Sequence, residues 1–161
     1  MAVEAEDFVV EKGWKTIQNG QGNYMVCAIG FNHISGERLL GVDSKDTTAS
    51  AYKDVTVPVA GNYRLWVRYE YPPFCETRFK ASVIQNGKPV AEKVMGAKDN
   101  PRIAFGDKVL KAQYDPSWGS EGLVEEPLDV NGLQAGAARI VLQAAEQPQL
   151  PGVAANRNID F

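Results

Sequence analysis

The chain has 161 residues, 44% of them hydrophobic, which is enough to bury one core, and no shift in composition marks an internal boundary. We therefore expect a single domain over residues 1–161. The net charge of −3 arises from interspersed acidic and basic residues with no lysine- or arginine-rich run, which argues against a nucleic-acid partner. No stretch approaches the roughly 20 apolar residues that span a bilayer, so we expect no membrane span.

The chain opens with an acidic run, Val3-Glu4-Ala5-Glu6-Asp7-Phe8. If this run is a strand, side chains alternate with period two, so Glu4 and Glu6 share one face. Two carboxylates this close are either splayed into water or held together by a cation, for which calcium is the natural choice. Asp160, at the other end of the chain, would supply a third carboxylate if the two ends pair. Spacing alone leaves both interpretations open.

The clearest strand signal lies in residues 55–69, around the turn Gly61-Asn62. After this turn two sets of side chains alternate. We expect one set to face the core: Tyr63, Leu65, Val67 and Tyr69. The other set should face outward: Arg64, Trp66 and Arg68.

A second hairpin is predicted for residues 79–84 and 90–94, joined through Asn86-Gly87. Later strands are indicated at 126–130 and 138–143, with a glycine-containing turn between them. Short strands, glycine-rich turns and no sustained helical period predict an all-β protein, an antiparallel β-sandwich.

Three connections are too long to be simple turns: residues 13–36, 71–75 and 97–122. Long loops on a compact scaffold are usually functional. They also contain aromatic residues. Any one ring can be a packing contact that holds the loop to the sandwich, but several together suggest a cleft; they include Trp14, Tyr24, Phe31, Tyr71, Phe74, Phe105, Tyr114 and Trp118.

The ends and the cysteines give weaker signals. Met1 precedes a strand-like pattern and is interpreted as a start codon added to a mature segment, while the closing run 158–161 reads as a strand that has barely begun. We therefore expect this domain to be excised from a longer parent chain. Cys27 and Cys75 either pair across loops in a secreted protein or stay free, and we adopt free thiols.

Several segments, taken in order, resemble carbohydrate-binding modules of the family six and family thirty-five kind. The resemblance extends from Val3 to Phe161. Two of the long loops have no counterpart in those modules that aligns. The segments are the opening Val-Glu-Ala-Glu, the Val-Thr-Val-Pro-Val-Ala-Gly-Asn-Tyr-Arg-Leu-Trp-Val-Arg-Tyr core, the Asn-Gly-Lys hairpin, the Leu-Gln-Ala-Gly strand entry and the closing Asn-Ile-Asp.

This resemblance implies a galactose-binding-like jelly roll that binds carbohydrate at its loop end and is secreted or extracellular. It also implies a structural calcium held by Glu4, Glu6 and Asp160. Asn158 matches the sugar-site asparagine of family six modules in position.

The other ligand-binding residues follow from the chemistry of a sugar. Aromatic rings pack against the C–H face of a pyranose, and fixed polar groups replace the water around its hydroxyls. Phe31 and Trp118 are the expected stacking rings, and Arg157 would favour an acidic sugar. The resemblance also allows a second sugar site on a sheet face, which Trp66 would suit. We instead expect a long loop to cover that indole.

An enzyme is the competing interpretation. His33 is the only histidine, and no serine lies in a Gly-x-Ser-x-Gly elbow. Glycoside hydrolysis needs two facing carboxylates. The third long loop offers candidates, but acidic residues in a solvent-facing loop are usually only solvated. We therefore expect a non-catalytic module, and the alternative is a protein-binding or spacer sandwich. The candidates are Asp115, Glu121, Glu125 and Glu126.

Overall fold

The computed structural model describes residues 1–18, 38–42, 46–71, 78–97, 100, 103–104, 122–146 and 157–160. One 3-10 helix precedes the strands. The elements are η1 (Ala5–Asp7), β1 (Val9–Lys12), β2 (Lys15–Gln18), β3 (Arg38–Val42), β4 (Ser50–Val57), β5 (Gly61–Tyr71), β6 (Phe79–Gln85), β7 (Lys88–Met95), β8 (Ile103–Ala104), β9 (Gly122–Leu133), β10 (Gly136–Ala144) and β11 (Arg157–Asp160). These ranges contain no helix of the length and apolarity that a membrane crossing requires.

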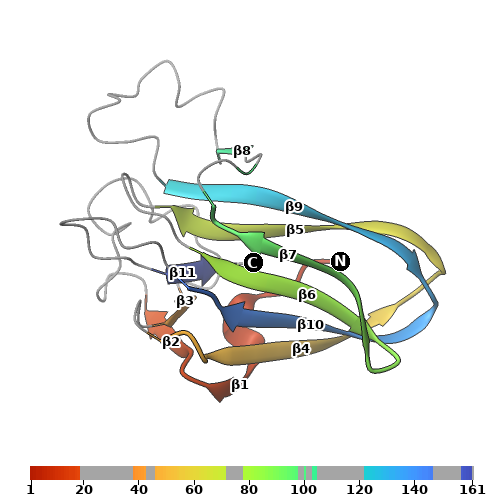
Figure 1. Ribbon diagram of the computed structural model, residues 1–161, viewed down its shortest axis with the longest axis horizontal. Coiled ribbons are helices and arrows are strands. Elements are labelled where there is room, and N and C mark those ends of the chain that lie inside the picture. Colours follow the sequence, from red (N-terminus) through yellow and green to blue (C-terminus); the bar gives the residue numbers. More distant parts are fainter. Residues whose placement is uncertain are drawn as a thin grey trace.

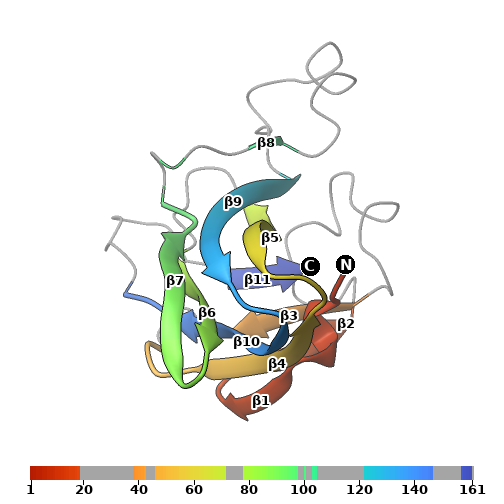
Figure 2. The ribbon, with the colours of Figure 1, turned by 90° about the vertical axis from the view of Figure 1, so that its right-hand side faces the viewer.

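The strands form two antiparallel sheets packed face to face (Figures 1 and 2). The five-stranded sheet has the order β1-β4-β10-β6-β7, and the six-stranded sheet has the order β2-β3-β11-β5-β9-β8. The two sheets meet along one side, where β7 packs against β9. The predicted antiparallel β-sandwich is confirmed.

Alternation along β5 follows the expected pattern. Val67 and Tyr69 are fully buried, and Leu65 is partly buried against the core. Tyr63 departs from the expectation, because 37% of it is exposed and its hydroxyl donates a hydrogen bond to the Val59 carbonyl. The inward-facing side chains of β5 are therefore fully buried at Val67 and Tyr69 and partly exposed to solvent at Tyr63.

The second predicted hairpin is present as β6 and β7. Gln85 pairs with Lys88 across a two-residue turn in which Asn86 and Gly87 both have positive φ angles, of 54° and 73°. Glycine and asparagine are the residues that adopt this conformation readily, and it matches the twist of the strands.

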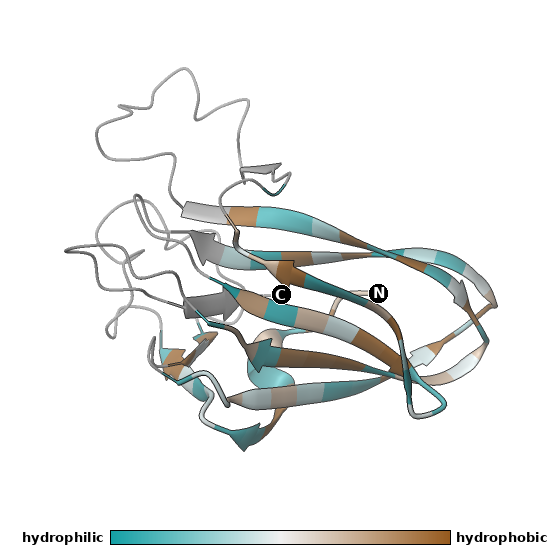
Figure 3. Ribbon diagram, viewed as in Figure 1, coloured by the Kyte–Doolittle hydropathy of each residue, from teal (hydrophilic) through white to brown (hydrophobic). Residues whose placement is uncertain are grey.

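Part of the core lies between β10 and the strands that face it. Figure 3 shows a continuous hydrophobic stretch along β10, where Ile140 and Leu142 are at most 4% exposed. The Tyr69 and Phe79 rings, one from each sheet, meet edge to face with centroids 5.2 Å apart. Such a pair adds about 0.5–1.5 kcal/mol beyond the area it buries.

The opening run differs from the sequence expectation. Ala5–Asp7 forms a 3-10 helix, closed by a hydrogen bond from the Phe8 N–H to the Ala5 carbonyl, and the first strand starts only at Val9. Glu4 and Glu6 therefore do not lie on one face of a strand, and that expectation is wrong. In a 3-10 helix the side chains three residues apart share a side, so this turn gives Glu4 and Glu6, which are two residues apart, no common face.

Candidate functional site

Glu6 is a carboxylate almost without solvent contact, since its side chain is 2% exposed. One oxygen, Oε1, lies 3.9 Å from Arg38 Nε, while Oε2 is buried with no hydrogen-bond partner. Burial raises the pKa of this carboxyl, and the nearby Glu4 raises it further, although the backbone and Arg38 act in the opposite direction. An orphaned, buried carboxylate oxygen requires a counter-charge that the described residues do not supply in full.

The helix η1 that contains Glu6 packs against β3 and β11. In β11, Asp160 pairs with Arg68 of β5, and Ile159 bridges β3 and β5. The backbone of Asp160 therefore lies in the strand that contacts η1. Carboxylate oxygens are the donors that calcium prefers, so Glu6 fits a calcium ligand. No group of three metal-ligating side chains occurs among the side chains described, a set that does not include that of Asp160.

The outer face of β5 and β9 presents an aromatic side chain to solvent. Trp66 is 42% exposed, so the expectation that a long loop covers it is wrong. Its cross-strand neighbour is Pro127, and the Arg64 guanidinium lies 5.8 Å from the indole centroid. The indole thus stands on a sheet face with a proline on one side and a cation above it.

Two arginine–carboxylate pairs flank this indole. Arg64 Nε donates to Asp129 at 2.6 Å, and Arg68 Nη2 donates to Glu125 at 3.0 Å. The hydrogen bond from Arg64 lowers the pKa of Asp129, so the carboxyl is charged at neutral pH. The two pairs hold donors and acceptors in fixed places on either side of a flat ring.

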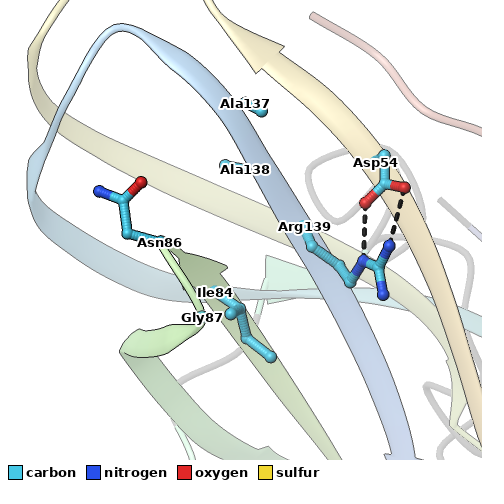
Figure 4. A pocket seen from close by; sticks show the side chains of 7 residues that line it. All are labelled: Asp54, Ile84, Asn86, Gly87, Ala137, Ala138 and Arg139. Atoms are coloured by element: carbon cyan, nitrogen blue, oxygen red, sulfur yellow. Dashed lines mark hydrogen bonds and ion pairs between the residues drawn. The ribbon is translucent and has the colours of Figure 1, made fainter.

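The opposite sheet has a shallow hollow of about 420 Å³ on its outer face (Figure 4). Arg139 makes two hydrogen bonds to Asp54, at 2.6 and 2.9 Å, and its guanidinium lies 3.8 Å from the centroid of the Tyr52 ring. We do not assign a ligand to this hollow.

No protein-family model matches the sequence, and no curated protein matches it. Among solved structures, a family 35 carbohydrate binding module from Clostridium thermocellum is 19% identical with a TM-score of 0.55, and the match covers 98% of this chain and 93% of that one. A cycloisomaltooligosaccharide glucanotransferase from Paenibacillus sp. is 20% identical with a TM-score of 0.56. That match covers 98% of this chain but only 17% of the enzyme.

The chain has the fold of a carbohydrate-binding module. At this level of identity the similarity concerns the fold, and its near-complete coverage of the Clostridium module shows that the whole sandwich is shared. The resemblance inferred from the sequence is confirmed at that level.

Within this carbohydrate-binding-module fold, the structure describes the backbone positions of two of the four predicted ligand-binding residues. Arg157 and Asn158 begin β11, where their backbones pair with Val42 and Gly41 of β3. Phe31 and Trp118, the expected stacking rings, lie outside the described residues. Trp66 is not among the site residues expected from the sequence, although the alternation along β5 indicates its outward position.

Two of the four candidate catalytic carboxylates are described, and both are engaged elsewhere. Glu125 pairs with Arg68, whereas Glu126 is fully buried. Glu126 accepts hydrogen bonds from three groups besides an ion pair with Lys93; the donors are Tyr69 Oη, the Gly96 N–H and Asn100 Nδ2. Asp115 and Glu121 fall outside the described ranges.

Proposed function

We propose that this domain binds carbohydrate without catalysing its cleavage. The observation that supports the proposal is the exposed indole of Trp66 between the pairs Arg64–Asp129 and Arg68–Glu125. The C–H face of a sugar ring packs on an indole, and hydroxyls at the ring edge need fixed donors and acceptors. A flat aromatic platform with a charged pair on each side provides both.

The solved structures with the same fold agree with a sugar ligand. One is described as a carbohydrate binding module, and the other is an enzyme complexed with cycloisomaltoheptaose.

We assign a second part of the binding surface to the loop end of the sandwich. There Asn158 would be the polar anchor, Trp118 and Phe31 the stacking rings, and Arg157 a source of preference for acidic sugars. In support, β11 begins at the end of the sandwich where β5 ends and β6 begins (Figure 1). The long connections predicted from the sequence join strands at this same end.

We further propose a structural calcium ion held by Glu6, Glu4 and Asp160. The partnerless oxygen of Glu6 and the packing of η1 against β11 support this assignment. A bound divalent cation would neutralise the buried carboxylate and tie the N-terminal segment to β11. A secreted or extracellular location completes the proposal, in keeping with the resemblance to carbohydrate-binding modules.

A polysaccharide and glycan array, probed with and without calcium, tests the proposal. The wild-type protein should bind at least one glycan, and Trp66→Ala, Trp118→Ala and Asn158→Ala should each weaken binding without unfolding the domain. An assay for release of reducing ends on the bound glycan should show no turnover. Absence of binding to every glycan in both conditions would refute the function.

A further inference from the structure

The outer face of β5 and β9 carries three cross-strand pairs in a row. Each pair joins a residue of β5 to the residue that faces it on β9. In order along β5 the pairs are Arg64–Asp129, Trp66–Pro127 and Arg68–Glu125. Successive pairs are two residues apart, so all three stand on the same face, and the outer two are separated by about 14 Å. That span is longer than one pyranose ring, so a ligand that touches all three pairs is a stretch of sugar chain.

Both arginines of this face are bound to carboxylates of the neighbouring strand. Arg64 Nε donates to Asp129 at 2.6 Å, and Arg68 donates to Glu125 through Nε at 3.3 Å and Nη2 at 3.0 Å. The two positive and two negative side chains together carry no net charge. The Arg64 and Asp129 side chains are 53% and 60% exposed, so a ligand beside Trp66 reaches a cation and an anion together.

These two acids oppose a ligand that carries negative charge. A ligand carboxylate that approached Arg64 would lie beside Asp129, and like charges in contact repel each other. It could bind only by displacing Asp129 from a charge-assisted hydrogen bond of 2.6 Å. The same holds for Arg68 and Glu125. The arginines therefore do not make this face a site for acidic sugars.

A neutral sugar meets no such repulsion, because a hydroxyl group both donates and accepts hydrogen bonds. An ionised carboxylate accepts at about four lone-pair sites, so Asp129 can accept a sugar hydroxyl while it keeps its bond from Arg64. The Arg64 guanidinium has five N–H donors, and Nε accounts for one of them. Between the two ion pairs, the exposed indole of Trp66 offers a flat surface to the C–H face of a sugar ring.

We propose that Asp129 and Glu125 are specificity-determining residues, which make the Trp66 face selective for linear, uncharged polysaccharides and exclude acidic ones. Such selectivity rests on the proposed carbohydrate-binding function and gives the class of ligand for this face. A repulsive element that rejects the wrong ligand is a common source of specificity. The loop end, where Arg157 would favour an acidic sugar, would then bind a different class of ligand.

Binding of the 161-residue protein to immobilised polymers tests this selectivity, with xylan, galactan, mannan and dextran as neutral probes and polygalacturonate as the acidic probe. The wild type should bind at least one neutral polymer, and Trp66→Ala should weaken that binding. Because the face carries no net charge, the neutral affinity should change less than about twofold when the salt concentration is raised about tenfold.

Asp129→Asn removes one negative charge and keeps the shape of the side chain, so it should raise the affinity for polygalacturonate about fivefold or more. Glu125→Gln should act in the same direction. Adding Trp66→Ala to either variant should abolish the gain. Asp54→Asn is the matched control, because it frees Arg139 on the opposite sheet and changes the net charge by the same amount. This control should give no gain.

Polygalacturonate binding by the wild type that Trp66→Ala removes would overturn the selectivity, as would an equal gain in Asp129→Asn and Asp54→Asn. Neutral binding that depends on Trp66, together with no gain in Asp129→Asn and Glu125→Gln, would overturn the role of the two acids and leave the proposed function intact. If the wild type bound none of the polymers, neutral or acidic, both the proposed function and the selectivity would be refuted.

Discussion

The hydroxyl of Tyr69 donates a 2.8 Å hydrogen bond to the carboxylate of Glu126, and both residues are fully buried. The same carboxylate accepts the Gly96 N–H and Asn100 Nδ2 and pairs with Lys93 Nζ at 2.9 Å. Glu126 thus joins β5, β7 and the start of the connection that follows β7. A buried charge with this many partners is tolerated because its lone pairs are satisfied.

Glu126→Ala should therefore lower the free energy of unfolding by about 3–5 kcal/mol, because the Tyr69 hydroxyl and the Gly96 N–H lose their acceptor inside the core. Urea unfolding measures this. The neighbouring Glu125→Ala is the matched control, since it removes a partly exposed pair and should cost less than about 1 kcal/mol. Equal effects of the two changes would contradict the buried role of Glu126.

Trp66 should dominate the solvent-accessible fluorescence of the described tryptophans, because it is 42% exposed and Trp14 is 3% exposed. Acrylamide should quench this component, and Trp66→Phe should remove it. Because the indole lies outside the core, the substitution should change stability by no more than about 0.5 kcal/mol. Weak quenching that Trp66→Phe leaves unaltered would place the ring under cover.

Calcium should stabilise the protein through Glu6. At about a hundred times its dissociation constant the ion adds roughly 2.7 kcal/mol, which raises Tm by about 5–10 °C for a chain of this size. Glu6→Gln should abolish this increase, yet in chelator it should be at least as stable as the wild type, because a buried charge is removed. An unchanged melt after exhaustive chelation, with no metal in the untreated protein, would exclude the site.

The loop-end site depends on Trp118 and Asn158. Trp118→Ala should abolish binding of a confirmed glycan there with the fold intact, because a shallow sugar site has few other contacts worth more than about 1 kcal/mol net. Asn158→Ala should weaken binding as well. Unfolding of Trp118→Ala, or glycan binding that persists in both variants, would show that the site lies elsewhere.

Period-two alternation predicted β5 well because that strand buries one face. The run Leu65, Val67, Tyr69 shows this directly. The same signal could have found Glu126, which falls in step with the buried residues Val124, Leu128 and Val130. Its charge indicates a solvated loop residue instead, and charge is the weaker of the two indications.

The opening run and Trp66 could not be predicted in the same way. Over a segment as short as Ala5–Asp7, a 3-10 turn and a strand are hard to distinguish by pattern, and the Phe8-to-Ala5 hydrogen bond is a property of the folded chain. Exposure of Trp66 depends on where segments distant in sequence come to lie. Alternation predicts on which face of the sheet a side chain lies. It does not predict which other segments of the chain cover that face.

The central position of β10 has a consequence for the order of folding. This strand fills the gap between β4 and β6, and its ion pair between Arg139 and Asp54 joins residues 85 positions apart. Pairings of such long range slow folding toward the millisecond-to-second regime. During synthesis from the N-terminus, β4 and β6 emerge well before β10. Each therefore keeps one hydrogen-bonding edge without its native neighbour until residues 136–144 are available, and a chaperone or a misfolding partner would meet the nascent chain at those two edges.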